Sequence, residues 1–179
     1  DAASLARGLR EKLGLAPGDR VALFMANAPE YAEILLAAWW AGLACVPVNA
    51  KLHPREVAYI LGNCGAGAVF ATPNWVRGLA EATAGMDRAP DVIEAGSVGY
   101  HALFGEPMPV ADVGDGALAW LFYTSGTTGR PKGAMLSHAN LRAMAQGYLT
   151  DVDAVSPGDC LLHAAPMSHG SGLYLVPYL

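Results

Sequence analysis

Val21-Ala-Leu-Phe-Met25 is a short, continuous apolar run without a single polar side chain. Such a run is typical of a β-strand that is buried on both faces of a sheet. Before it, leucines recur at the spacing of one helix face, which predicts a helix over 4–13. After it, Pro29 opens a second predicted helix, because proline costs little in a first helical turn. A buried strand between two helices indicates an α/β fold.

The same alternation of strand and helix patterns continues along the chain, which predicts a sheet with helices on both faces. The stretch 105–116 interrupts it with prolines, glycines and no periodicity, so we expect a linker between a first sub-block, 1–104, and a second, 117–179. Ser137 or Asn140 is the expected cap of the last helix. The expected helices span 4–13, 29–42, 53–63, 74–83 and 137–149, and the expected strands span 21–25, 44–48, 66–71, 91–94, 117–124, 133–136 and 160–164.

Composition narrows the classes of protein to which the chain can belong. Of the 179 residues, 53% are hydrophobic and 15% are charged, a balance that predicts a packed core rather than disorder. The net charge is −5 and the basic residues are scattered, which argues against a nucleic-acid-binding surface. We therefore expect no nucleic-acid partner.

The longest uncharged apolar run, 34–48, contains Pro47 and is shorter than the roughly 20 residues of a membrane helix. No transmembrane segment or signal peptide is expected. The three cysteines lack disulfide-like or metal-like spacing, as in buried, reduced thiols of a cytoplasmic protein. The chain starts without Met and stops inside an apolar run, so we expect the front part of a longer polypeptide; the oligomeric state is left open.

The most informative segment is Tyr123-Thr-Ser-Gly-Thr-Thr-Gly-Arg-Pro-Lys-Gly133, between two predicted strands. Within eleven residues it holds three glycines, four Ser or Thr hydroxyls and two cations. Glycine lets backbone N–H groups approach an anion closely, hydroxyls donate to phosphate oxygens, and lysine supplies a point charge. The candidate phosphate-binding residues are Thr124, Ser125, Gly126, Thr127, Thr128, Gly129 and Lys132.

The segment differs from the two common nucleotide loops. Counted from Gly126, Pro131 and Gly133 occupy the positions where a P-loop requires Gly and Ser or Thr. The dinucleotide pattern Gly-x-Gly-x-x-Gly is also missing. A plain polar hairpin loop is the alternative interpretation, although such a loop does not require all of these residue types together.

These eleven residues resemble the phosphate loop of the adenylate-forming enzyme superfamily. The similarity continues into Ala134-Met-Leu-Ser-His138, and Ala165-Pro-Met-Ser-His-Gly-Ser-Gly172 resembles a histidine-containing segment of the AMP-forming acyl-CoA synthetase branch. Upstream, 18–22, 27–30 and 44–49 resemble the opening strands of that branch. The resemblance spans essentially the whole chain, and it implies part of the large N-terminal α/β domain of such an enzyme.

The resemblance also implies an activity. Residues matching Thr124 to Gly129 and Lys132 hold the phosphates of ATP while a fatty or aromatic carboxylate attacks the α-phosphorus. An acyl-adenylate and pyrophosphate form, and coenzyme A then displaces AMP to give a thioester. Mg²⁺ accompanies ATP. Lys132 is the predicted catalytic residue, acting by charge stabilisation, because an exposed ammonium stays protonated at pH 7.

His169 and Gly170 are the predicted substrate-binding residues, because the matching histidine of the family lines the acyl pocket. A satisfied core histidine is the alternative for His169. The other histidines form no i, i+4 pair and have no cysteine nearby, so no metal site is expected. His53 is expected at a helix entry and His163 in a strand.

Further parts of the family's site are implied to lie beyond Leu179: the adenine, ribose and metal contacts, and a mobile C-terminal domain. The isolated chain is therefore expected to be inactive. Two other functions stay open at this point: an amino-acid-activating domain that loads a carrier protein, and a non-catalytic nucleotide-binding module.

Overall fold

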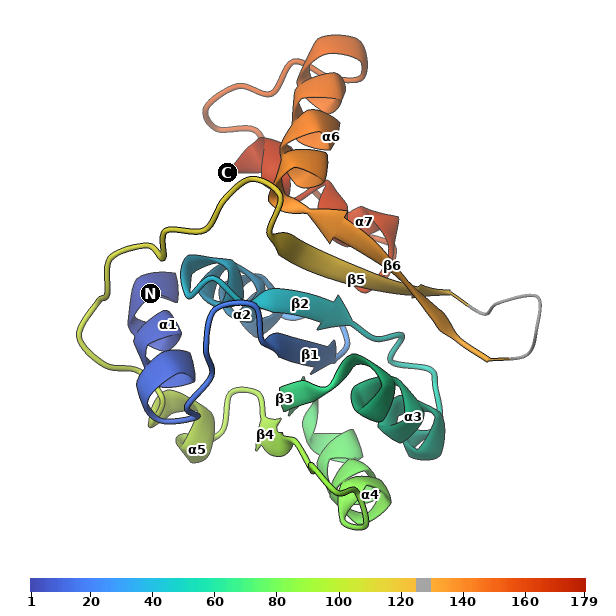
Figure 1. Ribbon diagram of the computed structural model, residues 1–179. Helices are drawn as coiled ribbons and strands as arrows, with labels where there is room; N and C mark the ends of the chain where they lie inside the picture. The colour runs from blue at the N-terminus through green and yellow to red at the C-terminus, as the bar shows by residue number, and fades with distance from the viewer. Residues whose placement is uncertain (125–129) are drawn as a thin grey trace.

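The computed structural model describes residues 1–124 and 130–179, whose core is one mixed β-sheet covered by helices (Figure 1). The strands lie in the order β4-β3-β1-β2-β5-β6. The strands are β1 (Arg20–Phe24), β2 (Ala44–Pro47), β3 (Ala66–Ala71), β4 (Asp91–Glu94), β5 (Leu118–Thr124) and β6 (Lys132–Ser137). The helices are α1 (Ala2–Glu11), α2 (Pro29–Trp40), α3 (Pro54–Cys64), α4 (Pro73–Thr83), α5 (Val98–His101), α6 (His138–Asp151) and α7 (Gly170–Leu173), with a 3-10 turn η1 (Val176–Tyr178).

The first five strands pair in parallel, and β6 returns antiparallel to β5. Parallel strands need crossover connections, and helices α2, α3 and α4 form those from β1 to β2, from β2 to β3 and from β3 to β4. β5 and β6 instead pair as an antiparallel hairpin, with Thr124 opposite Lys132 at the end nearest the turn. The prediction that strands and helices alternate around one sheet is confirmed.

Two apolar clusters cover the two faces of the sheet. One face packs against α1 and α2, with Leu5, Tyr31 and Ile34 fully buried. The other face packs against α3 and α4 through Val57 and Leu79. Because both faces are covered, the central strand β1 is buried over four of its five residues, as its unbroken apolar run predicts.

Residues 105–116 form no helix or strand, as predicted, but they are attached to the first helices. The Arg7 guanidinium Nε donates to the Glu106 carbonyl at 2.6 Å, and the Trp40 indole N–H donates to the Met108 carbonyl at 2.7 Å. The strands on either side of this stretch, β4 and β5, belong to the same sheet. The division into two sub-blocks stays a prediction.

The predicted strand Cys160–Ala164 is wrong, because this stretch is irregular. Leu162 is 84% exposed and Cys160 is exposed, so the short apolar run has no face to bury against a neighbour. The Cys160 thiol is thus not buried as expected, whereas Cys45 is buried. The strand position predicted for His163 is wrong for the same reason.

Of the helices in residues 1–124 and 130–179, none combines the length and the apolar composition that crossing a bilayer requires.

Gly8 and Gly147 give a matched pair of Gly→Ala substitutions within helices. A Cβ atom at Gly8 would lie 2.0 Å from the Leu103 carbonyl oxygen, whereas at Gly147 it would meet nothing within 4 Å. We expect Gly8→Ala to lower the free energy of unfolding by about 2 kcal/mol or more, since backbone must move. We expect Gly147→Ala to raise it by about 0.5 kcal/mol through helix propensity. Urea unfolding of both variants measures this, and equal effects would contradict the close α1–Leu103 packing.

Candidate nucleotide and acid site

A cleft of about 880 Å³ lies where the carboxyl ends of β2 and β5 meet. Ligands of parallel α/β sheets bind at this end of the strands. One wall comes from the first turns of α3, the opposite wall from the end of the β5–β6 hairpin, and Ser168 and His169 close a third side. The described residues that line the cleft are Pro47, Val48, Asn49, Leu52, Arg55, Glu56, Tyr59, Ile60, Phe122, Tyr123, Thr124, Arg130, Pro131, Ser168 and His169.

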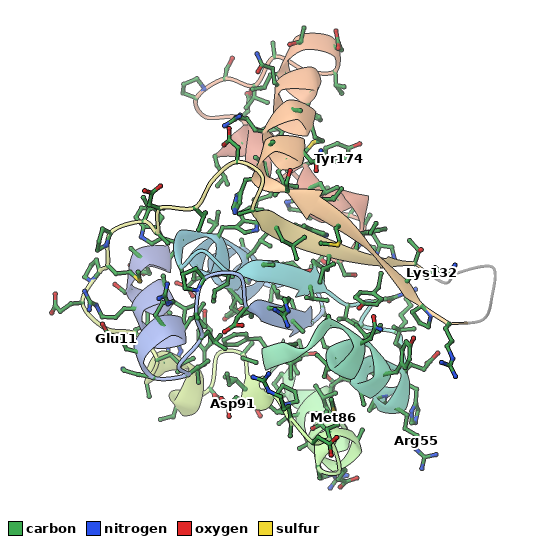
Figure 2. All side chains as sticks on the ribbon, viewed as in Figure 1. Glu11, Arg55, Met86, Asp91, Lys132 and Tyr174 are labelled. Carbon is green, nitrogen blue, oxygen red and sulfur yellow. The ribbon has the colours of Figure 1, made fainter. Side chains whose placement is uncertain are left out.

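Thr124 and Lys132 oppose each other at the turn end of the hairpin. They are direct partners in the antiparallel register, so their side chains project to the same face of the sheet. Both are exposed. Figure 2 shows Lys132 at this end of the hairpin. Thr124 lines the cleft, and Lys132, its neighbour on the adjacent strand, lies next to the lining residue Pro131 without lining the cleft itself. Ser125, Gly126, Thr127, Thr128 and Gly129 lie outside the described residues.

The cleft is more basic than the chain as a whole. Of the charged side chains that the structure describes along it, two are cationic, Arg55 and Arg130, and one is acidic, Glu56. The Glu56 carboxylate accepts the His53 backbone N–H at 2.9 Å and thereby caps α3. Cations around an open cleft attract an anionic ligand, in a chain whose net charge is −5. Sequence reasoning did not assign Arg55 or Tyr59 to a site; their i, i+4 spacing on one helix face was the available signal.

His169 lies against Phe122 of β5. The two rings meet edge to face, with centroids 6.2 Å apart and planes at 86°. The Ser168 hydroxyl hydrogen-bonds the His169 Nδ1 atom at 3.0 Å. His169 is exposed on the cleft, so the alternative of a buried core histidine is wrong for this structure. Gly170 begins α7 and does not line the cleft, and its role in binding stays a prediction.

Two other histidines have structural partners. His53 caps α3, as predicted, with its Nδ1 atom accepting the Arg55 backbone N–H at 3.2 Å. His163 pairs through Nδ1 with the Ser171 hydroxyl at 2.9 Å. Within residues 1–124 and 130–179, no three His, Cys, Asp or Glu side chains come together in a way that could hold a metal ion.

Tyr123 connects the hairpin to α3. Its hydroxyl donates to the Asn63 side-chain oxygen at 2.6 Å, and its ring approaches Gly133, where a Cβ would lie 3.1 Å from the ring. Burial, together with smaller contributions from the neighbouring Cys64 and Tyr59, raises the pKa of the Tyr123 hydroxyl to about 12. The phenol therefore acts as a neutral hydrogen-bond donor and not as a base.

The fold is the mixed α/β sheet with helices that forms the N-terminal domain of adenylate-forming ligases. The family model of AMP-binding enzymes matches residues 1–179, and the chain belongs to this family. The resemblance seen in the phosphate loop is thereby confirmed.

Relatives and solved structures agree with this assignment. The chain is 41% identical over 175 residues to a feruloyl-CoA synthase of Amycolatopsis, covering 97% of the chain and 34% of that enzyme. It is 33% identical over 182 residues to a sulfoacetate–CoA ligase of Cupriavidus necator, covering 97% and 35%. ATP-bound MatB from Rhodopseudomonas palustris superposes with a TM-score of 0.84 at 31% identity, covering 98% of the chain and 36% of MatB. The chain thus spans about a third of the length of these proteins.

Tyr123→Phe isolates the hydroxyl that joins the hairpin to α3. Because the folded pKa of about 12 lies above the ordinary value of 10, Tyr123 stabilises the fold fully below pH about 10 and loses this contribution as the pH rises toward 12. We expect the variant to be less stable by about 1 kcal/mol at neutral pH. The difference in unfolding free energy between the two proteins, followed from neutral to alkaline pH, measures it. A difference that grows with pH would contradict the assignment.

Proposed function

We propose that the protein containing this chain activates a carboxylic acid with ATP and transfers the acyl group to coenzyme A. A carboxylate oxygen attacks the α-phosphorus of ATP, the bond to the β-phosphate oxygen breaks, and pyrophosphate leaves. The thiol sulfur of coenzyme A then attacks the acyl carbon, loses its proton, and AMP departs. The opposed pair Thr124–Lys132 at the mouth of a basic cleft is the observation that carries this proposal.

The chain's own residues bind and orient the phosphates. The Lys132 ammonium neutralises charge on the β- and γ-phosphates, and the Thr124 hydroxyl donates to a phosphate oxygen. Transfer at phosphorus depends mainly on positioning and on stabilising negative charge, for which exposed donors next to a cleft are suited. Arg130, two residues before Lys132, adds a cation that lines the cleft directly. Mg²⁺ remains a prediction, since the acidic residue expected near it belongs to a later part of the family's sequence.

Support for an aromatic acid comes from two directions. The relative at 41% identity is named a feruloyl-CoA synthase, which makes ferulic acid or a related hydroxycinnamic acid the first substrate to test. The cleft also presents the rings of Tyr59, Phe122 and Tyr123, with His169 edge-on against Phe122. Planar acids gain contact area against such rings. His169 is proposed to line the acyl side of the site.

Because the chain spans about a third of its relatives, the adenine, ribose and coenzyme A contacts are proposed to come from the remaining part of the enzyme. The isolated chain is correspondingly proposed to lack turnover, since one loop and one cleft wall cannot orient the entire nucleotide.

Lys132→Ala tests the phosphate role. We expect kcat/KM for ATP to fall about 100-fold in the full-length protein, because one preorganised charge contact in the transition state is lost. Lys132→Arg keeps the charge and should retain more activity than Lys132→Ala. Arg77→Ala, which removes an exposed cation on α4, is the matched control, and its kcat/KM for ATP should equal that of the unmodified protein. Pyrophosphate release reports the rate, and an unchanged Lys132→Ala variant would exclude the proposed role.

An acid panel tests the reaction and its substrate class. With ATP and coenzyme A present, we expect AMP formation to be fastest with hydroxycinnamic acids, slower with long-chain fatty acids, and slowest with amino acids. Omitting coenzyme A should stop turnover after adenylate formation. Turnover only with amino acids, or none with any acid in the panel, would overturn the proposal in favour of one of the two alternative functions.

A further inference from the structure

Asn27 holds the segment that carries His169. It follows β1, at the carboxyl end of the strand that lies between β2 and β3. Its side-chain nitrogen donates to the carbonyl oxygens of His163 at 3.0 Å and Ala165 at 2.9 Å. Its side-chain oxygen accepts the backbone N–H of Met167 at 2.8 Å. Three hydrogen bonds thus join residues separated by 136 to 140 positions in the chain.

The match between this carboxamide and the segment is specific. An Asn side chain offers two N–H donors and one oxygen, and the three contacts use all of these groups. Asp has no donor for the two carbonyl groups, and Ala has neither donor nor acceptor. The backbone of 163–167 forms no strand pairing within the described residues, so Asn27 supplies hydrogen bonds that a sheet neighbour would otherwise provide.

The segment 163–172, which Asn27 holds, is packed tightly, so its residues are held together as one unit. Met167 is 4% exposed and belongs to the apolar cluster on the α1–α2 face. A Cβ at Gly172 would lie 2.0 Å from the Met167 carbonyl oxygen, so the start of α7 rests directly on the anchored residue. His163 and Ser171 close the segment on itself. His169 lies two residues after Met167, inside this closed unit.

We infer that Asn27 is a positioning residue: its carboxamide fixes the 163–172 segment on the end of β1 and thereby sets where His169 stands against Phe122 on the cleft. The inference rests on the proposed function, in which His169 lines the acyl side of the site. Asn27 itself does not line the cleft, so it acts through the segment and not by touching substrate. A displacement of about 1 Å at a substrate-orienting group is enough to reduce catalysis strongly.

The test combines Asn27→Ala, the nearly isosteric Asn27→Asp and His169→Ala in the full-length protein. We expect each Asn27 variant to raise KM for the acid about tenfold while KM for ATP changes less than about twofold, because only the acyl side is displaced. The KM for the acid of the double variant Asn27→Ala/His169→Ala should lie within about twofold of that of His169→Ala. The two changes should not add, because both act on the same contact between His169 and the acid. Asn74→Ala, on the exposed surface of α4, is the control and should leave both KM values unchanged.

Amide hydrogen exchange of the peptide 163–172 gives a readout that does not depend on activity. In Asn27→Ala this peptide should exchange faster, by about fivefold, while peptides of α4 keep their rate. Unchanged exchange would overturn the anchoring. Faster exchange with an unchanged KM for the acid, or losses that add in the double variant, would overturn the positioning of His169. Absence of AMP formation by the unmodified protein with every acid would instead refute the proposed function, and the exchange result would still decide the anchoring.

Discussion

The pairing of β5 with β2 is the contact on which the site depends. Cys45 of β2 lies beside Trp120 of β5, which is fully buried, and the Trp39 indole N–H donates to the Ala119 carbonyl at 2.8 Å. The Trp39 and Trp120 rings pack with centroids 5.9 Å apart. This parallel pairing directs the end of β5 toward the carboxyl ends of the other strands. Tyr123 and Thr124 at the end of β5 consequently share the cleft with α3, which is far away in sequence.

Much of the fold could be predicted from local patterns. The bounds predicted for β3 and β4 agree with the structure. Ser137 and Asn140, each predicted as a possible cap, together form a capping box at the start of α6. Hydrophobic periodicity and capping are properties of neighbouring residues, which is why they were visible. The strand order depends on contacts between distant residues, which no local pattern records. The failed strand at Cys160–Ala164 has the same cause, because a short apolar run does not show whether a partner strand exists. The antiparallel direction of β6 instead follows from its short connection to β5, because parallel neighbours need a crossover of about a dozen residues or more.

The site was predictable in part for a related reason. Thr124, Lys132 and His169 stand in segments whose residue types are unusual together, and the structure brings Thr124 and His169 to one cleft with Lys132 at its mouth. Arg55 stands in ordinary local sequence, and Asn27 lies in the segment 27–30, whose resemblance to the family implied no role for it. Their relation to the cleft arises only when α3 and the end of β1 are placed beside segments about 70 or more positions later. Residues that position others leave little trace in a single sequence.

The capping of α3 also explains how the cleft keeps its basic character. The Glu56 carboxylate faces the N-terminal N–H groups of the helix, where the positive end of the helix dipole stabilises a negative charge. Among the described residues, no ion pair joins Arg55, Arg130 or Lys132 to a carboxylate. The acidic side chain in the cleft is therefore balanced by backbone dipoles, and the cations remain directed at solvent. An anion can approach these cations without first breaking a salt bridge, which favours an anionic ligand over a neutral one.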